Sequence, residues 1–474
     1  MSEDQRASHD SDVPPALAAD LLTGWAADPV LDTTPQDVAP YAAKRRAALS
    51  PFLGPRAAVI PSGILRARAG DTDYAFRASS DYTWLTGDTE PDGVLVLQPV
   101  AGGHEAVLYV PARSGRTTIE FFASRAGELW VGRRPDPAET GARLAVECRP
   151  FSEAEAVLTG LADPVVVRGV DPRIDAWCSP VDARGDAELL RHLAELRLLK
   201  DDWELGQLRE ATAATARGFA DVIRERAGAL EHGERWLEGT FWRRARAEGN
   251  DVGYSSIVAS GAHATTLHWS RNDGRVRDGD LLLMDMGVET RSLYTADVTR
   301  TIPFDGRFSP DQRAVYDLVL AAQRAGIDAV RPGAEFLAPN RAAMRVLAEG
   351  LHAWGILRVA PDEALDEDPY GSHAGLHRRY TLHNVSHMLG IDVHDCAAAR
   401  TEAYREGILA GGMVLTVEPG LYFQPDDLTV PEELRGIGVR IEDDILVTRD
   451  GHENLSDQLP RSAADVERWV AAQR

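Results

Sequence analysis

Cysteines and long apolar runs are both scarce in this chain. It has three cysteines in 474 residues, and their wide spacing excludes a disulfide framework and favours a reducing, cytoplasmic location. No apolar run approaches the ~20 residues that a helix needs to cross a bilayer, so no membrane is expected as a partner. The first residues, MSEDQRASHDSDVPP, are acidic and polar, which is the opposite of a signal peptide.

Positive charge is in deficit as well. Lysine and arginine number 51 against 74 aspartates and glutamates, which gives a formal net charge of −23. Because nucleic-acid binding needs a concentrated positive surface, we expect neither DNA nor RNA as the main partner. The sequence also contains no Walker A motif, no G-x-S-x-G nucleophile elbow and no CxxC pair, so none of those chemistries is indicated.

What is present is the composition of an ordinary globular protein, 44% hydrophobic and 26% charged. The chain is too long for one hydrophobic core, so two domains are expected. Residues 1–38 are predicted to form an N-terminal tail that is partly disordered. Residues 39–180 mix helical segments with short β-like runs such as DGVLVLQPV and EAVLYVP, which predicts an α/β domain. After a break near residues 177–186, residues 190–474 form the second domain.

In the second domain, two helices followed by strands occur twice. Asp201 with Glu204 resembles a capping box, and Ser309 with Gln312, around a proline, marks another helix start. The hydrophobic pattern further predicts helices over about 234–247 and 340–354, strands over 252–303 and most of 380–449, and an exposed loop over 361–379. This order predicts a pseudo-symmetric α+β domain of two halves.

Two apolar strands of this domain end in acids. Asp285 follows the run Leu281–Met284, and Glu418 follows the run Met413–Val417. A buried carboxylate costs several kcal/mol unless it is paired or bound to a cation. Asp285 alone could equally well cap its strand at the surface.

Two further strands carry acids on one face. In YTADVTRTIPF the alternation places Asp297 and Thr299 together, and for Asp297 alone a solvated face is favoured. In GIGVRIEDDILV the period of two places Arg440, Glu442 and Asp444 on one face. We therefore expect Arg440 to hold Glu442 ionised and oriented.

The segment HNVSHMLGIDVHD, residues 383–395, contains three of the thirteen histidines around a short apolar run. A histidine-rich surface loop would explain it, and so would one ligand imidazole in a cavity lined by the others. His383 and His387 have the i, i+4 spacing of a zincin helix, but Asn384 stands where HExxH needs Glu. Together with the strand acids, the segment indicates an oxygen-rich site with one imidazole, which suits Mn, Co or Zn in a two-metal arrangement.

Five segments in this order, MDMG, ADVTRT, SHMLGIDVHD, TVEPGLY and GVRIEDD, resemble the pita-bread metallopeptidase family, which includes methionine aminopeptidase, prolidase and aminopeptidase P. The stretch AFRASSDYTWLTGDTEPDGVLVL and the tail RGIGVRIEDDILVTRDGHENLS resemble its aminopeptidase P branch, over about residues 40–460. The resemblance implies an α/β N-terminal domain of the aminopeptidase P type. It makes residues 190–474 a pseudo-symmetric α+β pita-bread (creatinase/aminopeptidase-like) catalytic domain.

The resemblance also implies a ligand set. The family's five-ligand pattern falls on Asp285, Asp297, His387, Glu418 and Glu442. It implies that Asp285 holds one metal ion, that His387 and Glu418 hold the other, and that Asp297 and Glu442 bridge both. Two divalent metal ions are therefore expected, with Mn²⁺ favoured and Co²⁺ or Zn²⁺ as alternatives.

Other residues match positions that surround the family's metal ligands or face its substrate: His268, His383, His394, Tyr422 and Arg440. In the implied mechanism, His268 or His394 would stabilise the oxyanion. Glu418 would accept a proton and pass it to the leaving proline nitrogen, and His383 is the remaining catalytic candidate. The other histidines are expected to be exposed, among them His373, His377 and His452.

The implied activity is hydrolysis of the N-terminal residue from peptides with proline second, by a homodimer or homotetramer built partly through the N-terminal domain. Proline forms a tertiary amide without an N–H, so a dedicated pocket is expected. Prolidase, restricted to dipeptides, would share all five ligands and stays an alternative. A metal-free creatinase-like relative or interaction module would lose the acidic ligands, and all of them are present here.

Two features depart from the family pattern. The spacing from Asp285 to Asp297 is one residue longer than in the best-known bacterial members, which predicts a bulge in the intervening hairpin. The loop over 361–379 is also longer than usual.

Overall fold

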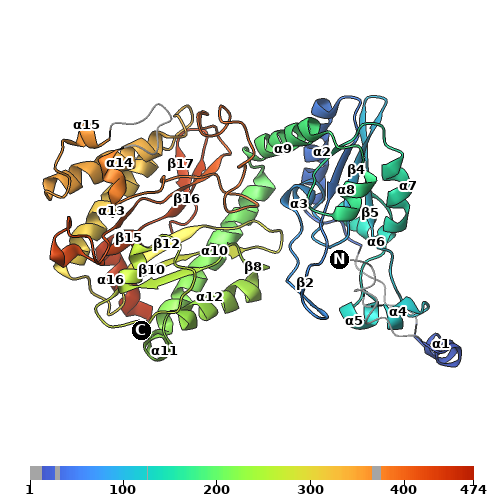
Figure 1. Cartoon of the computed structure of the whole chain (residues 1–474), viewed down its shortest axis with the longest axis horizontal. Helices are drawn as coiled ribbons and strands as arrows, with labels where there is room; N and C mark the ends of the chain where they lie inside the picture. The colour runs from blue at the N-terminus through green and yellow to red at the C-terminus, as the bar shows by residue number, and fades with distance from the viewer. Residues whose placement is uncertain (1–12, 27–32, 125, 366–374, 474) are drawn as a thin grey trace. The chain divides into compact units, whose positions relative to one another are not determined.

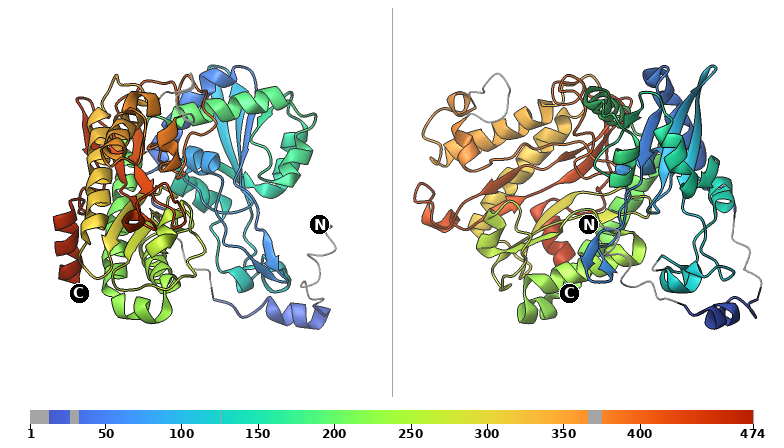
Figure 2. Two further views of the ribbon diagram at one scale, coloured as in Figure 1. Left: turned by 60° about the vertical axis from the view of Figure 1, so that its left-hand side comes forward. Right: turned by 45° about the vertical axis from the view of Figure 1, so that its right-hand side comes forward.

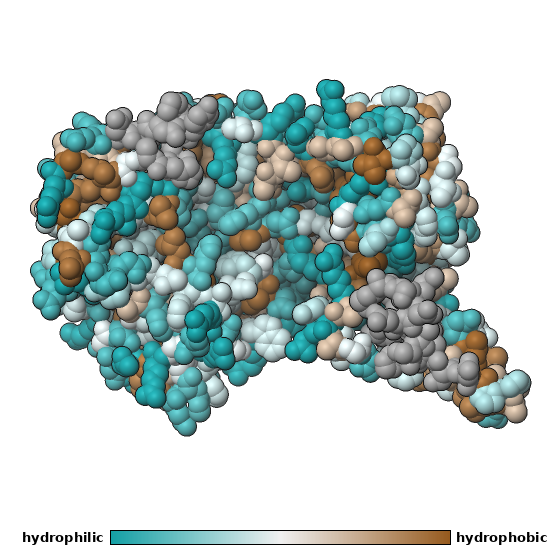
Figure 3. Space-filling view, in the orientation of Figure 1, coloured by the Kyte–Doolittle hydropathy of each residue, from teal (hydrophilic) through white to brown (hydrophobic). Residues whose placement is uncertain are grey.

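The structure is a computed structural model that describes residues 13–26, 33–124, 126–365 and 375–473. The disorder expected for the first dozen residues, and the exposure expected for His373, lie outside the described residues. The chain folds into two compact units, residues 1–193 and 194–474 (Figure 1). The face drawn in Figure 3 is mostly hydrophilic, with apolar side chains scattered over it.

A five-stranded mixed sheet forms the centre of the first unit, in the order β6-β5-β4-β1-β7. β4 runs antiparallel to both of its neighbours, while the outer strands β6 and β7 run parallel to β5 and β1. The strands are β1 (Ala58–Pro61), β4 (Val94–Val100), β5 (Gly103–Val110), β6 (Glu147–Pro150) and β7 (Val165–Val166), with a separate hairpin of β2 (Ala67–Ala69) and β3 (Thr72–Asp73). Residues 94–97 of β4 are buried, because helices cover a strand of continuous apolar residues on both faces.

The helices of the first unit are mostly short. They are α1 (Pro15–Leu21), α2 (Ala39–Leu53), α3 (Ser80–Thr86), α4 (Glu120–Ala123), α5 (Glu128–Val131), α6 (Pro137–Leu144), α7 (Ala154–Thr159) and α8 (Pro172–Trp177), and α9 (Ala183–Arg197) runs across the boundary between the units. Helices and sheet together form the α/β fold that the sequence predicted for this part of the chain.

The second unit begins with two helices that pack on a three-stranded sheet, β12-β10-β9. The elements are α10 (Asp202–Arg224), α11 (Arg226–His232), α12 (Glu234–Glu248), β8 (Asp251–Val252), β9 (Ile257–Ser260), β10 (Leu281–Met286), β11 (Val288–Glu289) and β12 (Val298–Pro303). The predicted capping box is present, because Asp201 Oδ1 accepts from the Glu204 N–H at 3.0 Å and Glu204 Oε2 accepts from the Asp201 N–H at 2.9 Å.

The second half repeats this order. Its helices are α13 (Pro310–Ala329), α14 (Ala338–Ala353) and α15 (Pro361–Ala364), and its strands are β13 (Val414–Val417), β14 (Gly420–Tyr422), β15 (Gly438–Arg440), β16 (Asp443–Val447) and β17 (His452–Asn454), followed by α16 (Ala463–Gln473). Ser309 and Gln312 form the predicted capping box of α13. Figures 1 and 2 show the α10/α12 pair and the α13/α14 pair covering the strands that lie between them. The two-halved α+β arrangement was thus predicted correctly.

Residues 380–413 differ from the prediction. Strands were expected over most of 380–449, but the first strand of that region is β13, and residues 380–413 contribute only two isolated bridges, Met388 with Leu415 and Ile408 with Glu335. The apolar run 388–391 is nevertheless buried, since tertiary contacts bury a short apolar segment as readily as a sheet does.

The loop over 361–379 is described only in part, because residues 366–374 lie outside the described residues. The described part holds α15 and a 3₁₀ turn over Leu376–Arg379. His377 was expected to be exposed, but it is 4% exposed, with its Nδ1 2.7 Å from the carbonyl oxygen of Ala364. That prediction was wrong, because the turn folds the imidazole back onto α15, whereas His452 is exposed as expected.

The hairpin between Asp285 and Asp297 has no bulge within residues 281–303, all of which the structure describes. The pairing runs without a shift from Leu281 opposite Pro303 to Met286 opposite Val298, and the bridge of Glu289 with Thr295 continues the same register. The longer spacing is therefore accommodated at the hairpin tip.

The core of the second unit lies between the helices and strands of both halves. Phe219 of α10 and Phe241 of α12 are fully buried and pack edge to face, with ring centroids 6.1 Å apart. The same cluster includes Met284 and Met286 of β10. Among the described residues, none of the helices combines the length and apolar character that crossing a membrane requires.

Candidate metal centre

Asp285 lies at the buried end of β10. It is 8% exposed, so it does not cap the strand at the surface. Its Oδ1 accepts a hydrogen bond from the Tyr254 hydroxyl at 2.6 Å, and its Oδ2 accepts from Arg440 Nη2 at 2.6 Å. The burial cost of this carboxylate is thus offset by a phenol and a guanidinium.

Asp297 lies directly before β12, the strand that pairs with β10. It is 6% exposed, which excludes the solvated face that the strand pattern alone had favoured. Its Oδ2 lies 3.2 Å from His387 Nε2. Its backbone N–H donates to Asp444 Oδ2 at 3.2 Å, so residues of the second half of this unit contact both its side chain and its backbone.

Glu442 lies between β15 and β16 and is 1% exposed. Its N–H donates to the Thr299 carbonyl at 3.1 Å, and its Oε2 accepts from Thr299 Oγ1 at 2.6 Å. Arg440 was expected to pair with Glu442, but its guanidinium instead donates to Asp285, to Thr299 Oγ1 at 3.0 Å and to Tyr422. The strand period gives the correct face, but the long side chain extends to β10, which belongs to a different sheet.

His387 and Glu418 come from adjacent backbone segments. The Thr416 N–H donates to the His387 carbonyl at 3.0 Å, which fixes the histidine beside β13 and the acid that follows it. His387 Nδ1 is 3.1 Å from the Met388 carbonyl, and a carbonyl only accepts, so Nδ1 carries the proton. His387 Nε2 is therefore directed to Glu418 Oε1, 3.5 Å away, and to Asp297.

All five predicted ligands meet in one place. Ligand atoms of Asp297, His387 and Glu442 all lie within 4.8 Å of one another, and Glu418 joins them through His387. The charge of Asp285 acts on both Asp297 and Glu418. The five side chains come from five separate segments of the chain, so only the fold brings them together.

Burial dominates the electrostatics of this cluster. It raises the pKa of Asp297, against the hydrogen bond from His387, and with neighbouring negative charges it raises the pKa of Glu442 well above its usual range. Burial also raises the pKa of Glu418 to about 7, although the His387 charge opposes it. For His387 itself, burial lowers the pKa, but the bond to Asp297 and the Glu418 charge outweigh it and raise the pKa to about 9. Buried acids that repel one another around one imidazole are a donor set that fits divalent cations.

A hydrogen-bonded chain connects Arg440 to His383. Arg440 Nη1 donates to the Tyr422 hydroxyl at 2.9 Å, and that hydroxyl is 2.8 Å from His383 Nε2. His383 Nδ1 faces the Asn384 carbonyl at 2.9 Å, so Nδ1 carries the proton and Nε2 accepts from Tyr422. Burial, followed by the Arg440 charge, lowers the pKa of His383 to about 3, so this imidazole is neutral. Its Nδ1 also lies 3.4 Å from Glu418 Oε2.

His394 and His268 lie at the exposed rim of the site. The His394 ring packs edge-on against the His387 ring, with centroids 4.2 Å apart. Burial and then the His387 charge lower the pKa of His394. The charge of His268 also acts on His383 and His394, so all the predicted histidines surround one space.

Three residues of the site were not predicted as part of it: Tyr254, Thr299 and Asp444. Tyr254 stands in the stretch GYSS, which carries no pattern that would have identified it. Thr299 and Asp444 lie on the strand faces that the period of two assigned to the site, and that alternation could have found them. Asp444 is fully buried, and burial raises its pKa well above the usual range.

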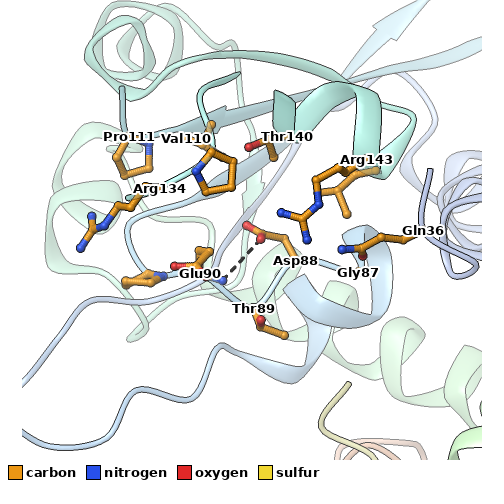
Figure 4. Close-up of a pocket in the computed structure, with 13 residues that line it drawn as sticks. Gln36, Gly87, Asp88, Thr89, Glu90, Val110, Pro111, Arg134, Thr140 and Arg143 are labelled. Atoms are coloured by element: carbon orange, nitrogen blue, oxygen red, sulfur yellow. Dashed lines mark hydrogen bonds between the residues drawn. The ribbon is translucent and has the colours of Figure 1, made fainter. Parts of the chain in front are cut away.

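The first unit contains a separate pocket. Figure 4 shows Asp88 among its lining side chains, together with Arg134, Arg143 and Thr140. The Tyr82 hydroxyl donates to Asp88 Oδ2 at 2.6 Å. Burial raises the pKa of Asp88 to about 6, with the bond from Tyr82 opposing it. No predicted site residue lines this pocket.

The sequence and the fold both match known metallopeptidases. Residues 206–449 match the model of metallopeptidase family M24, and residues 41–166 match the aminopeptidase P N-terminal domain. The chain is 54% identical to Xaa-Pro aminopeptidase 2 of Streptomyces coelicolor over 458 residues, which cover 96% of each chain. Among solved structures it is similar to Pseudomonas aeruginosa aminopeptidase PepP, with a TM-score of 0.79, 32% identity and 92% and 98% of the two chains covered. It is likewise similar to aminopeptidase P from E. coli with the inhibitor Pro-Leu, with a TM-score of 0.78, 32% identity and 91% and 98% coverage.

A two-halved domain around a cluster of carboxylates and one imidazole defines a metal-dependent hydrolase. The chain belongs to metallopeptidase family M24 and carries the N-terminal domain of aminopeptidase P. The predicted fold class, the metallo-aminopeptidase class and the use of divalent metal ions are thereby confirmed, and the substrate is a peptide.

Proposed function

We propose that this chain is an Xaa-Pro aminopeptidase, which hydrolyses the bond between the N-terminal residue of a peptide and a proline in second position. The observation that carries this proposal is the convergence of the five predicted ligands into one buried cluster. It occurs in a chain that is 54% identical, over nearly its whole length, to a Streptomyces coelicolor protein of that name.

Asp285, Asp297, His387, Glu418 and Glu442 are the proposed ligands of two divalent ions. Asp285 would hold one ion, His387 and Glu418 would hold the other, and Asp297 and Glu442 would serve both. Four carboxylates and one imidazole favour Mn²⁺, with Co²⁺ and Zn²⁺ as alternatives. When bound, such a pair of ions supplies a nucleophile at neutral pH and polarises the scissile carbonyl.

Glu418 is the proposed proton carrier. It is a carboxylate beside His387 within the ligand cluster, 3.5 Å from His387 Nε2, and a carboxylate so placed can accept a proton and release it. His383 Nδ1 lies 3.4 Å from Glu418 Oε2 while its N–H is directed to the Asn384 carbonyl. Because His383 is neutral, it lies beside the carboxylate without supplying a competing charge. The leaving proline nitrogen receives the proton from Glu418.

The rim histidines are the proposed oxyanion donors. His394 and His268 are exposed beside the buried ligands, which places ring N–H groups where a substrate carbonyl can reach them. Arg440 and Tyr422 connect Asp285 to His383 through hydrogen bonds along one side of the site. Because an Xaa-Pro bond has no N–H, selectivity has to come from contacts with the proline ring.

Substrate and metal can be tested together. Metal-stripped protein is assayed on Arg-Pro-Pro and on Ala-Pro, with Mn²⁺, Co²⁺ or Zn²⁺ added back. We expect no cleavage without metal, restoration by Mn²⁺, and cleavage of the tripeptide. Cleavage of Ala-Pro alone would identify a prolidase, and activity indifferent to chelation would contradict the proposal.

The domain organisation completes the proposal. Residues 39–180 form the N-terminal domain after the tail 1–38, and residues 190–474 form the catalytic domain. The matched ranges 41–166 and 206–449 and the compact units 1–193 and 194–474 support it. A cytoplasmic homodimer or homotetramer is proposed, and the free state of all three cysteines supports a reducing location. Light scattering and cell fractionation test these two points.

A further inference from the structure

Asp395 is a buried carboxylate held by two cations that lie about 195 positions earlier in the chain. It is 1% exposed. Arg197 Nε donates to its Oδ1 at 3.0 Å, and Lys200 Nζ donates to its Oδ2 at 3.2 Å. The Lys200 side chain is fully buried, and its Nζ also donates to the Arg197 carbonyl at 2.8 Å. Burial alone would raise the pKa of Asp395, but Lys200 and Arg197 outweigh it and lower the pKa, so the carboxylate is ionised.

The backbone of Asp395 acts on the ligand histidine. Its N–H donates to the Met388 carbonyl at 3.0 Å. The same carbonyl oxygen accepts from His387 Nδ1 at 3.1 Å. One oxygen, with its two lone pairs, therefore links the backbone of Asp395 to the ring of His387. Since the Asp395 side chain is fixed by its two cations, the direction of this carbonyl is fixed as well.

The fit around Asp395 is close. A Cβ added at Gly390 would lie 2.2 Å from Asp395 Oδ2 and 2.9 Å from Lys200 Cε, so the backbone here approaches as closely as only glycine permits. The Gly390 carbonyl accepts from the Thr295 N–H at 3.1 Å, two residues before Asp297. The Asp395 cluster therefore also touches the hairpin that carries a second proposed ligand.

We infer that Asp395, clamped by Arg197 and Lys200, is a positioning residue for the proposed metal ligand His387, acting through the Met388 carbonyl. The clamp sets the rotation of the imidazole, so that Nε2 faces Asp297 and Glu418. A ligand imidazole needs such a partner on its other nitrogen, and loss of such partners typically costs about 10–100-fold in metal affinity or activity. This inference rests on the proposed function, because it assigns the clamp to the same site.

Metal affinity tests the inference in the full chain. Lys200→Met removes the buried ammonium, and Asp395→Asn removes the charge of the carboxylate while keeping its size and backbone N–H. We expect each variant to bind Mn²⁺ about 10–100-fold more weakly by calorimetric titration of the metal-stripped protein. The Mn²⁺ concentration that half-restores peptide hydrolysis should rise by a similar factor, while kcat at saturating Mn²⁺ changes less.

A matched control separates positioning from stability. Asp221→Asn breaks the ion pair with Arg244, which links α10 and α12 at 2.6 Å and touches none of the proposed ligands. It should lower thermal stability and leave Mn²⁺ affinity unchanged. Arg197→Gln, which keeps the Lys200 contact, provides a milder variant if Lys200→Met does not fold.

The two possible failures are distinguishable. Folded Lys200 or Asp395 variants that bind Mn²⁺ as tightly as the wild type would overturn the inference and leave the proposed function intact. A wild-type protein that binds no Mn²⁺, Co²⁺ or Zn²⁺ would overturn the proposed function and the inference together.

Discussion

Arg440 of β15 donates to Asp285 of β10, at 2.6 Å, and not to Glu442, two positions further along the chain. The same guanidinium donates to Thr299 and to the Tyr422 hydroxyl. Arg440 is therefore the residue that connects β10, β12 and β14 at the point where the proposed metal ligands meet.

Replacing Arg440 by lysine is expected to impair catalysis. A lysine has one nitrogen on a flexible stem and cannot reproduce the three directed contacts of the guanidinium. We predict a fall in kcat/KM of about 10–100-fold on an Xaa-Pro peptide at saturating Mn²⁺. Arg209→Lys serves as control, since Arg209 forms an exposed pair with Glu453, and an R440K enzyme with control-like activity would contradict the assignment.

Removing the Tyr422 hydroxyl should also lower activity. That hydroxyl accepts from Arg440 and donates to His383, so Tyr422→Phe leaves a buried guanidinium hydrogen and a buried ring nitrogen without their partner. We expect kcat/KM to fall about 10-fold, or ~1.4 kcal/mol. Tyr380→Phe is the matched control, because its hydroxyl contacts only Thr429 among the contacts described, at 3.1 Å. Equal kinetics for the two variants would count against the role of the Arg440–His383 chain.

The ion pair of Arg300 with Asp443 should matter for stability. Both side chains are fully inaccessible, and Arg300 Nη2 lies 2.7 Å from Asp443 Oδ1. Arg300→Met removes the nearest cation of the buried carboxylate and leaves Arg461 Nη1 at 3.6 Å from its Oδ2. We expect the free energy of unfolding to fall by at most about 3–5 kcal/mol. Urea unfolding measures this free energy. The control is Arg313→Met, which breaks the exposed pair with Asp317 and is expected to cost at most ~0.5 kcal/mol. Comparable losses for the two variants would show that Arg300 is not a buried-charge partner.

The pocket of the first unit predicts a pH effect on stability. The folded pKa of Asp88 is raised from 3.8 to about 6, so the folded state binds this proton more tightly than the unfolded state. The resulting stabilisation is fully present below pH ~3.8 and is lost as pH rises through ~6, a change of about 3 kcal/mol. As the pH rises from 4 to 8, the free energy of unfolding of Asp88→Asn, measured in urea, should therefore increase by that amount relative to the wild type. Parallel pH profiles for the two proteins would contradict it.

The sequence was sufficient where local physics determines the structure. The capping boxes at Asp201 and Ser309 were predicted because their hydrogen bonds join residues three apart. The strand at Leu281–Met286 was predicted from its apolar run. The proposed ligands were identified by resemblance to a family, and their acids could be placed on strand ends and faces from the pattern alone.

The sequence was insufficient where tertiary contacts decide. The partner of Arg440 depends on which strand lies beside it, and alternation gives a face but no distance. Tyr254 reaches Asp285 from a segment without any pattern. The residues around His387 are held by contacts with distant segments, such as Asp395 with Lys200. The sequence pattern does not reveal these contacts, so residues 380–413 were predicted as strand, although they form no strand.

The proposed peptidase chemistry depends most on five side chains holding a pair of cations. An anomalous difference map at the manganese edge, from crystals of the Mn²⁺-loaded protein, tests this directly. We predict two peaks about 3.5–4 Å apart, enclosed by Asp285, Asp297, His387, Glu418 and Glu442. Peaks elsewhere in the chain, or no peak among these residues at saturating Mn²⁺, would contradict it.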